Sequence, residues 1–271
     1  MRTGKISGAK GEADVGGFLS ISNQLPGSVF VLAHYDSGAS KDTEITIINS
    51  GLLSVRVHLF FIAPTGFLSE NAYVTVAPGT SEMVRTSILD SGNTGLVLGV
   101  ASDLTGNFIS YNYLTASGRY YDTNYDGTFP AFIFKCLVSE TVGTPILRFN
   151  GLFLEPQPYD MGLFDIRPDS FVAFTKLSGS LETGIDLFSS LSLKSQGSSG
   201  SMSKFVNAEV CQISGVLSTI YPELSGVLGI TGRLWANCAF GMVIDKTNPL
   251  RGLSVDTGTR VSATATIPVI P

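Results

Sequence analysis

Residues 43–59 read TEITIINSGLLSVRVHL, and this stretch decides the fold. Polar and apolar residues alternate over 43–48 and again over 54–59. Strict alternation puts every second side chain on the same face of a β-strand, so that one face meets a core and the other meets solvent. The Asn-Ser-Gly sequence at 49–51 is a turn signal. The stretch therefore predicts two strands joined by a turn.

Short segments with the same pattern follow along the chain, separated by turns rich in Gly, Pro, Asn and Ser. None shows a sustained helical period, so we predict an all-β protein. Short strands spaced roughly ten residues apart are typical of a β-sandwich. The predicted strands are 28–33, 43–48, 54–59, 73–76, 82–86, 96–101 and 108–114, and then 131–142, 144–154, 171–177, 185–193, 205–213, 234–244 and 260–270.

A change of composition divides the chain. Residues 115–130 combine Gly, Asp and Asn with Tyr and lack strand alternation, which indicates a domain junction. In the second half, 195–203 predicts a flexible loop, and 214–230 predicts either a short helix or a long connection. The predicted parts are an extended arm at 1–17, a first β-sandwich at 18–120, a junction at 121–130 and a second β-sandwich at 131–271, each sandwich Ig-like or jelly-roll-like.

The charge is unusually low. Only 14% of the residues are charged, against roughly 25% in an average soluble domain. Surfaces with few Lys and Glu are typical of proteins packed against neighbours. The net charge is −5 without a basic cluster, which argues against nucleic-acid binding. The apolar runs are far shorter than the roughly 20 residues of a membrane span, and the N-terminus lacks the apolar stretch of a secretory signal.

Catalytic patterns are missing from the sequence. The histidines, His34 and His58, have no cluster of His, Asp or Glu beside them, and no nucleophile-elbow pattern occurs. We therefore predict that the protein is not an enzyme. Cys136, Cys211 and Cys238 lie in apolar stretches. Buried free thiols are the favoured interpretation, and a Cys211–Cys238 disulfide is the alternative.

One segment has ligands for calcium. Asp122, Asn124 and Asp126 place oxygen atoms at alternating positions, and Gly127 follows, as in the first half of a Ca²⁺ loop. The Glu that should follow six residues after the glycine is replaced by Ile133. A structural Ca²⁺ ion is therefore one hypothesis, and an ordinary inter-domain turn is the other.

Tyrosines gather around the predicted junction. Such rings can stack on sugars, anchor a protein interface or cover the seam between two domains, and the last role is favoured. Trp235, between Leu234 and Ala236, is expected in the core. The candidate ligand-binding tyrosines are Tyr113, Tyr120, Tyr121 and Tyr125.

Four segments of the first half carry a resemblance to known proteins. They are ITIINSG at 45–51, VRVHLFF at 55–61, VAPGTS at 76–81 and TGLVLGVASD at 94–103. Together with the ending IPVIP at 267–271, they resemble a group of bacterial two-sandwich proteins of unknown function. The resemblance covers the chain from about residue 20 to its end. It implies the two-sandwich fold and an exported protein, and it implies neither a cofactor nor a catalytic residue.

These observations lead to a structural role. We expect a non-enzymatic subunit that assembles with copies of itself into an extracellular filament, a surface layer or a particle shell. Extracellular or cell-surface localisation is expected, with a virion as the alternative. A carbohydrate-binding or adhesive module that uses the tyrosines is the alternative function. The residues expected in assembly, by exchange of the arm or an edge strand, are Ile6, Val15, Phe18, Val261 and Ile267.

Overall fold

The alternation at the two deciding segments becomes two strands, β4 (Asp42–Asn49) and β5 (Val55–Ile62). The computed structural model describes residues 3–7, 17–22, 25–136, 153–154, 160–176, 179–180, 184–237, 240–246 and 261–262. In this part, antiparallel strands dominate and the helices are single turns. The all-β prediction is confirmed. The helices are α1 (Thr86–Leu89), α2 (Leu217–Ile220) and α3 (Pro222–Gly226).

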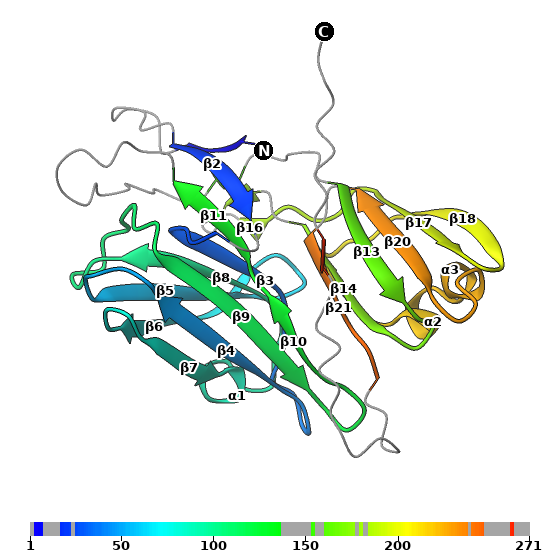
Figure 1. Ribbon diagram of the computed structural model, residues 1–271, viewed down its shortest axis with the longest axis horizontal. Helices are drawn as coiled ribbons and strands as arrows, with labels where there is room; N and C mark the ends of the chain where they lie inside the picture. Colours follow the sequence, from blue (N-terminus) through cyan, green and yellow to red (C-terminus); the bar gives the residue numbers. More distant parts are fainter. Residues whose placement is uncertain are drawn as a thin grey trace, which may run out of the picture.

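The first half of the molecule has the character of a β-sandwich (Figure 1). One sheet has the order β10-β9-β4-β7, and it faces part of a ten-stranded sheet of order β16-β15-β12-β1-β2-β11-β3-β8-β5-β6. Ile45 and Ile47 of β4 are fully buried, as are Leu59 and Phe61 of β5. The other strands of these sheets are β1 (Thr3–Ser7), β2 (Gly17–Ser22), β3 (Val29–Asp36), β6 (Leu68–Val76), β7 (Ser81–Arg85), β8 (Thr94–Ser102), β9 (Leu114–Tyr121), β10 (Asp126–Pro130), β11 (Phe132–Cys136), β12 (Phe153–Leu154), β15 (Gly179–Ser180) and β16 (Gly184–Ile185).

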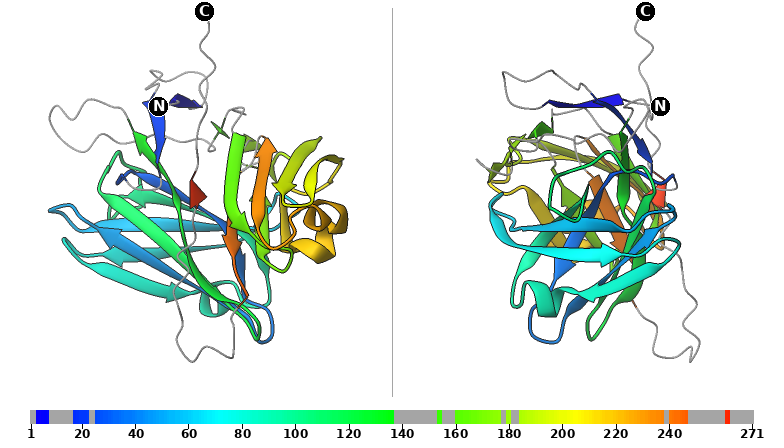
Figure 2. Two further views of the ribbon diagram at one scale, coloured as in Figure 1. Left: turned by 45° about the vertical axis from the view of Figure 1, so that its right-hand side comes forward. Right: turned by 90° about the vertical axis from the view of Figure 1, so that its left-hand side faces the viewer.

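Two smaller sheets form the second half, beside the first half in Figure 1 and behind it in the right view of Figure 2. One has the order β18-β17-β20-β13-β22, and the other has the order β19-β14-β21. The helices α2 and α3 follow β19, so the short-helix interpretation of 214–230 is confirmed. The strands are β13 (Asp160–Ile166), β14 (Phe171–Thr175), β17 (Leu191–Gly197), β18 (Gly200–Val206), β19 (Gln212–Val216), β20 (Gly232–Asn237), β21 (Phe240–Ile244) and β22 (Val261–Ser262).

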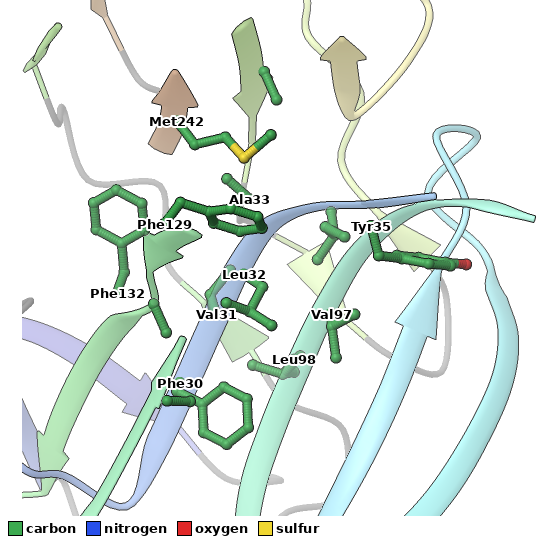
Figure 3. Packing of buried hydrophobic residues seen from close by; sticks show 14 of the residues in the cluster. Phe30, Val31, Leu32, Ala33, Tyr35, Val97, Leu98, Phe129, Phe132 and Met242 are labelled. Carbon is green, nitrogen blue, oxygen red and sulfur yellow. The ribbon is translucent and has the colours of Figure 1, made fainter. Parts of the chain in front are cut away.

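The two halves share one hydrophobic core. Figure 3 shows Met242 of β21 close to Ala33 of β3 and Phe129 of β10. The Thr175 hydroxyl donates to the Ala33 carbonyl at 2.7 Å. β11, which the sequence assigns to the second half, pairs with β3, and β12, β15 and β16 extend the same ten-stranded sheet. The division into two separate tandem sandwiches therefore stays a prediction.

Residues 115–130 contain strands that the sequence analysis did not predict. β9 runs through this region and pairs with both β4 and β10. Its inward positions include Ala116 and Gly118, which are too small to stand out as a hydrophobic face. Glycine is required at 118 because a Cβ there would overlap the Phe129 ring. The alternation exists, but two small residues stand between Leu114 and Tyr120 on the buried side.

The predicted flexible loop at 195–203 is wrong. β17 and β18 form a hairpin in which Gly197 lies opposite Gly200, so the Ser- and Gly-rich sequence continues the strands up to a tight turn. Gly200 has a φ of 129°, a conformation that favours glycine. The strand predicted at 205–213 is also wrong, because β18 ends at Val206 and β19 begins at Gln212.

Candidate assembly surface

The loop between β4 and β5 presents two leucines to solvent. Leu52 is 93% exposed and Leu53 is 61% exposed. A leucine side chain gains roughly 1.5–3 kcal/mol when it leaves water completely. Two adjacent leucines at the tip of a loop therefore form a surface that favours contact with another molecule.

Asn49 fixes the backbone of this loop. The residue is fully buried at the end of β4. Its amide nitrogen donates to the carbonyls of Leu53 at 2.8 Å and Val76 at 3.1 Å. Its amide oxygen accepts from the backbone N–H of Gly51 at 2.9 Å. Buried amide groups that are satisfied on both sides hold a loop in one conformation, so the leucines are presented on a preorganised loop.

Tyr111 supports the loop from the other side. Its hydroxyl lies 2.9 Å from Asn49 Oδ1 and 2.8 Å from the Leu53 carbonyl, and its one proton can serve either acceptor. A Cβ at Gly51 would overlap this hydroxyl, so the close approach requires glycine there. The tyrosine and the glycine together pack the inner side of the loop.

Two further apolar side chains are exposed on residues next to this loop. Tyr113 is 42% exposed, and its carbonyl accepts from the backbone N–H and the hydroxyl of Ser50 at 2.9 and 3.0 Å. Ile48 is 44% exposed and stands on the outer face of β4. We refer to Ile48, Leu52, Leu53 and Tyr113 as the leucine patch.

The patch continues into the outer face of the four-stranded sheet. At the far end of this face, four charged side chains pair across the strands. Arg85 lies 3.1 Å from Glu44, and Arg119 lies 3.4 Å from Glu44 and 2.8 Å from Asp126. Between these pairs and the patch, the register brings Thr46 beside Ser117. On its other side, Thr46 lies beside the exposed Met83 of β7. The face therefore combines an apolar end, an uncharged centre and charges that compensate one another.

The residues expected in assembly fall largely outside the described side chains. Val15 and Ile267 lie outside the described residues. Ile6, Phe18 and Val261 lie in β1, β2 and β22, where only the backbone is described. β1 pairs with β2 and β12 of the same chain, and β22 pairs with β13. Exchange of the arm or of the C-terminal strand stays a prediction.

The candidate tyrosines are divided between the two ends of β9. Tyr113 precedes the strand and Tyr121 ends it, which separates them by roughly 25 Å at about 3.3 Å per residue. Tyr120 is fully buried, and Tyr125 is 5% exposed with its hydroxyl donating to the Asp169 carbonyl. Only Tyr113 of this set belongs to the leucine patch. The structure does not bring the four rings together.

The candidate calcium ligands hold the β9–β10 turn through protein donors. Asp122 accepts from the backbone N–H groups of Asn124 and Tyr125 at 2.6 and 2.8 Å, and from the Tyr120 hydroxyl at 2.7 Å. Asp126 forms a bidentate pair with Arg119, with both distances 2.8 Å. Among the described residues, no group of three or more His, Cys, Asp and Glu is placed to hold a metal ion. Calcium binding remains a hypothesis.

Two other sequence predictions concern single residues. Trp235 is half-buried on β20, opposite Gly162 of β13, while Leu234 is fully buried and Ala236 nearly so. The tryptophan therefore faces outward, which corrects the core assignment. Cys211 is buried as a free thiol, as expected. The alternative, a Cys211–Cys238 disulfide, is not formed in this structure.

The leucine patch was missed by the sequence analysis. Its leucines follow directly after the Asn-Ser-Gly turn signal, and two consecutive leucines inside a turn were the available sign.

Comparisons with protein-family models, with curated proteins and with solved structures find no match. In the described ranges, no helix is long and apolar enough to cross a membrane.

Proposed function

We propose that the protein is a non-enzymatic structural subunit that assembles with copies of itself, and that the leucine patch is one of its contact surfaces. The observation that carries the proposal is the almost complete exposure of Leu52 on a loop that buried Asn49 holds in place. A mobile leucine would lose entropy on contact, whereas a preorganised one loses little. Leu52 thus has the properties of a contact residue in an interface.

The energy of the contact follows from the exposed fractions. Covering Leu52 and Leu53 contributes roughly 2–5 kcal/mol per subunit before the costs of association. A stable interface buries about 800 Å² on each partner, more than two leucines supply. The neutral sheet face beside the patch provides the additional area, because Thr46 and Ser117 lose little on desolvation when they retain hydrogen-bond partners.

In this proposal, the subunits assemble into an extracellular filament, a surface layer or a particle shell. The low fraction of charged residues, 14%, supports a surface that is largely covered by neighbours. The carbohydrate-binding alternative has less support, because buried Tyr120 and Tyr125 offer no free ring face to a sugar.

The test compares three proteins by size-exclusion chromatography with light scattering over a concentration series. They are the wild type, the double variant L52S/L53S, and the control I230S. Ile230 is 85% exposed in the second half, so its substitution removes an equally exposed apolar side chain elsewhere. We expect multiples of 28.7 kDa for the wild type and I230S, and a shift toward 28.7 kDa for the double variant. Equal masses for the double variant and the wild type would exclude the patch as a contact.

A further inference from the structure

His34 lies at the seam between the two halves and has one buried nitrogen without a partner. The residue belongs to β3 and is 1% exposed. Its ring packs against Tyr120 of β9, at 5.3 Å between centroids, and against Phe171 of β14, at 5.1 Å, and these two rings stack on each other at 5.0 Å. Within the described part of the chain, Nε2 of His34 is the buried side-chain nitrogen or oxygen that has no hydrogen-bond partner.

Gln212 of β19 reaches across the seam to the other ring nitrogen. Its amide nitrogen lies 2.8 Å from His34 Nδ1, 3.2 Å from the Ala33 carbonyl and 3.0 Å from the Gly95 carbonyl. Carbonyl oxygens only accept, so the NH₂ group must face them, and an NH₂ group only donates. The two amide hydrogens are shared among three acceptors, and a hydrogen on Nδ1 would point at the NH₂ group. Nδ1 of His34 therefore carries no hydrogen, and the ring is neutral with its proton on the unpartnered Nε2.

From this geometry we propose that the His34–Gln212 contact is an acid-sensitive latch, which holds the two halves together while His34 is neutral and loosens the seam when His34 is protonated. A protonated ring carries a hydrogen on Nδ1, which would point at the NH₂ group of Gln212. It would also place a positive charge beside a stacked pair of aromatic rings and away from water. The proposal is independent of self-assembly, since both residues belong to one chain.

The surroundings of His34 favour the neutral form. Burial lowers its pKa from the ordinary 6.5 to about 4, with Lys41 acting in the same direction and Asp36 against it. The side chains in contact with the ring are Tyr120 of β9, Phe171 of β14 and Gln212 of β19. Of these, only the tyrosine is titratable, and its pKa is raised by burial and by Asp122.

The direction of the pH effect follows from this lowered pKa. Between pH 6.5 and about 4, the unfolded chain binds a proton on His34 that the closed, folded chain does not bind. The contribution of His34 to stability is therefore complete above pH 6.5 and declines as the pH falls toward 4. The closed chain thus binds this proton more weakly than the unfolded chain, and acid favours the open or unfolded states.

The matched variants are H34F and H58Q. In H34F, a ring fills the aromatic site, and Gln212 keeps the Ala33 and Gly95 carbonyls as acceptors for its two hydrogens. H58Q removes the other histidine of the chain, whose pKa is also lowered by burial. We expect wild type and H58Q to lose stability in urea as the pH falls from 7 to 4.5, and H34F to lose much less.

Opening of the seam is measured by small-angle X-ray scattering with circular dichroism at pH 4.5. We expect a larger radius of gyration for the wild type with its strand signal retained, and an unchanged radius for H34F. If H34F does not fold, an NMR pH titration of histidine-labelled H58Q decides. This variant has one histidine, so its one labelled signal reports the protonation of His34. Titration of that signal near pH 6.5 in a chain that stays closed would overturn the proposal, as would equal acid sensitivity of H34F and the wild type.

Discussion

Replacing Asn49 by alanine tests how the leucine patch is held. The substitution leaves the Gly51 N–H without its acceptor and removes the donor from the Val76 carbonyl, while the Leu53 carbonyl keeps the Tyr111 hydroxyl. An unsatisfied buried group costs roughly 1–3 kcal/mol. With two such groups at a fully buried position, we expect N49A to lower the free energy of unfolding by about 2–4 kcal/mol.

Urea unfolding at pH 7 measures this loss. The midpoint should fall while the slope stays constant, since the amount of surface exposed on unfolding is unchanged. N71A is the matched control, because Asn71 is exposed and its side chain contacts the exposed edge of His58 at 3.2 Å, with no buried group depending on it among the described contacts. We expect the control to stay within about 0.5 kcal/mol of the wild type. A loss below this value for N49A would refute the argument that the buried amide holds the loop.

Two further predictions concern the core. A Cβ on Gly95 would overlap the carbonyl oxygen of Ile62 on the paired strand β5. G95A should therefore yield no folded protein, or lower the free energy of unfolding by more than about 3 kcal/mol. The control G226A, with open space around the glycine, should leave the melting temperature nearly unchanged. Burial raises the pKa of the Cys211 thiol to about 11 from an ordinary 9.0. Peptide mass spectrometry at pH 8 should therefore show labelling of Cys211 by iodoacetamide about 100-fold slower in the folded than in the urea-unfolded chain, and equal rates would contradict its burial.

The strands with large apolar residues could be predicted from the sequence. β4 extends the predicted segment by one residue at each end, and β5 begins one residue later and ends three residues later than predicted. Ile45, Ile47 and Leu59 mark the buried face in both sequence and structure. β9 could not be predicted in this way, because the small residues Ala116 and Gly118 occupy the two buried positions between Leu114 and Tyr120. Their small size is set by what they pack against, and that information lies on other strands.

The candidate sites depend on contacts between distant residues. His34 and Gln212 are 178 positions apart, so no local pattern predicts their contact. At the loop that carries the leucine patch, the Asn-Ser-Gly pattern identified Asn49 as part of a turn. The roles of Val76 and Tyr111 as its partners, and the outward direction of Leu52, follow only from the packed structure.

Self-assembly is the central claim, and electron microscopy of the purified wild-type chain with negative stain tests it most directly. We expect regular filaments, sheets or shells, with subunits in contact through the leucine patch. A field of separate particles of 28.7 kDa at every concentration would contradict the claim.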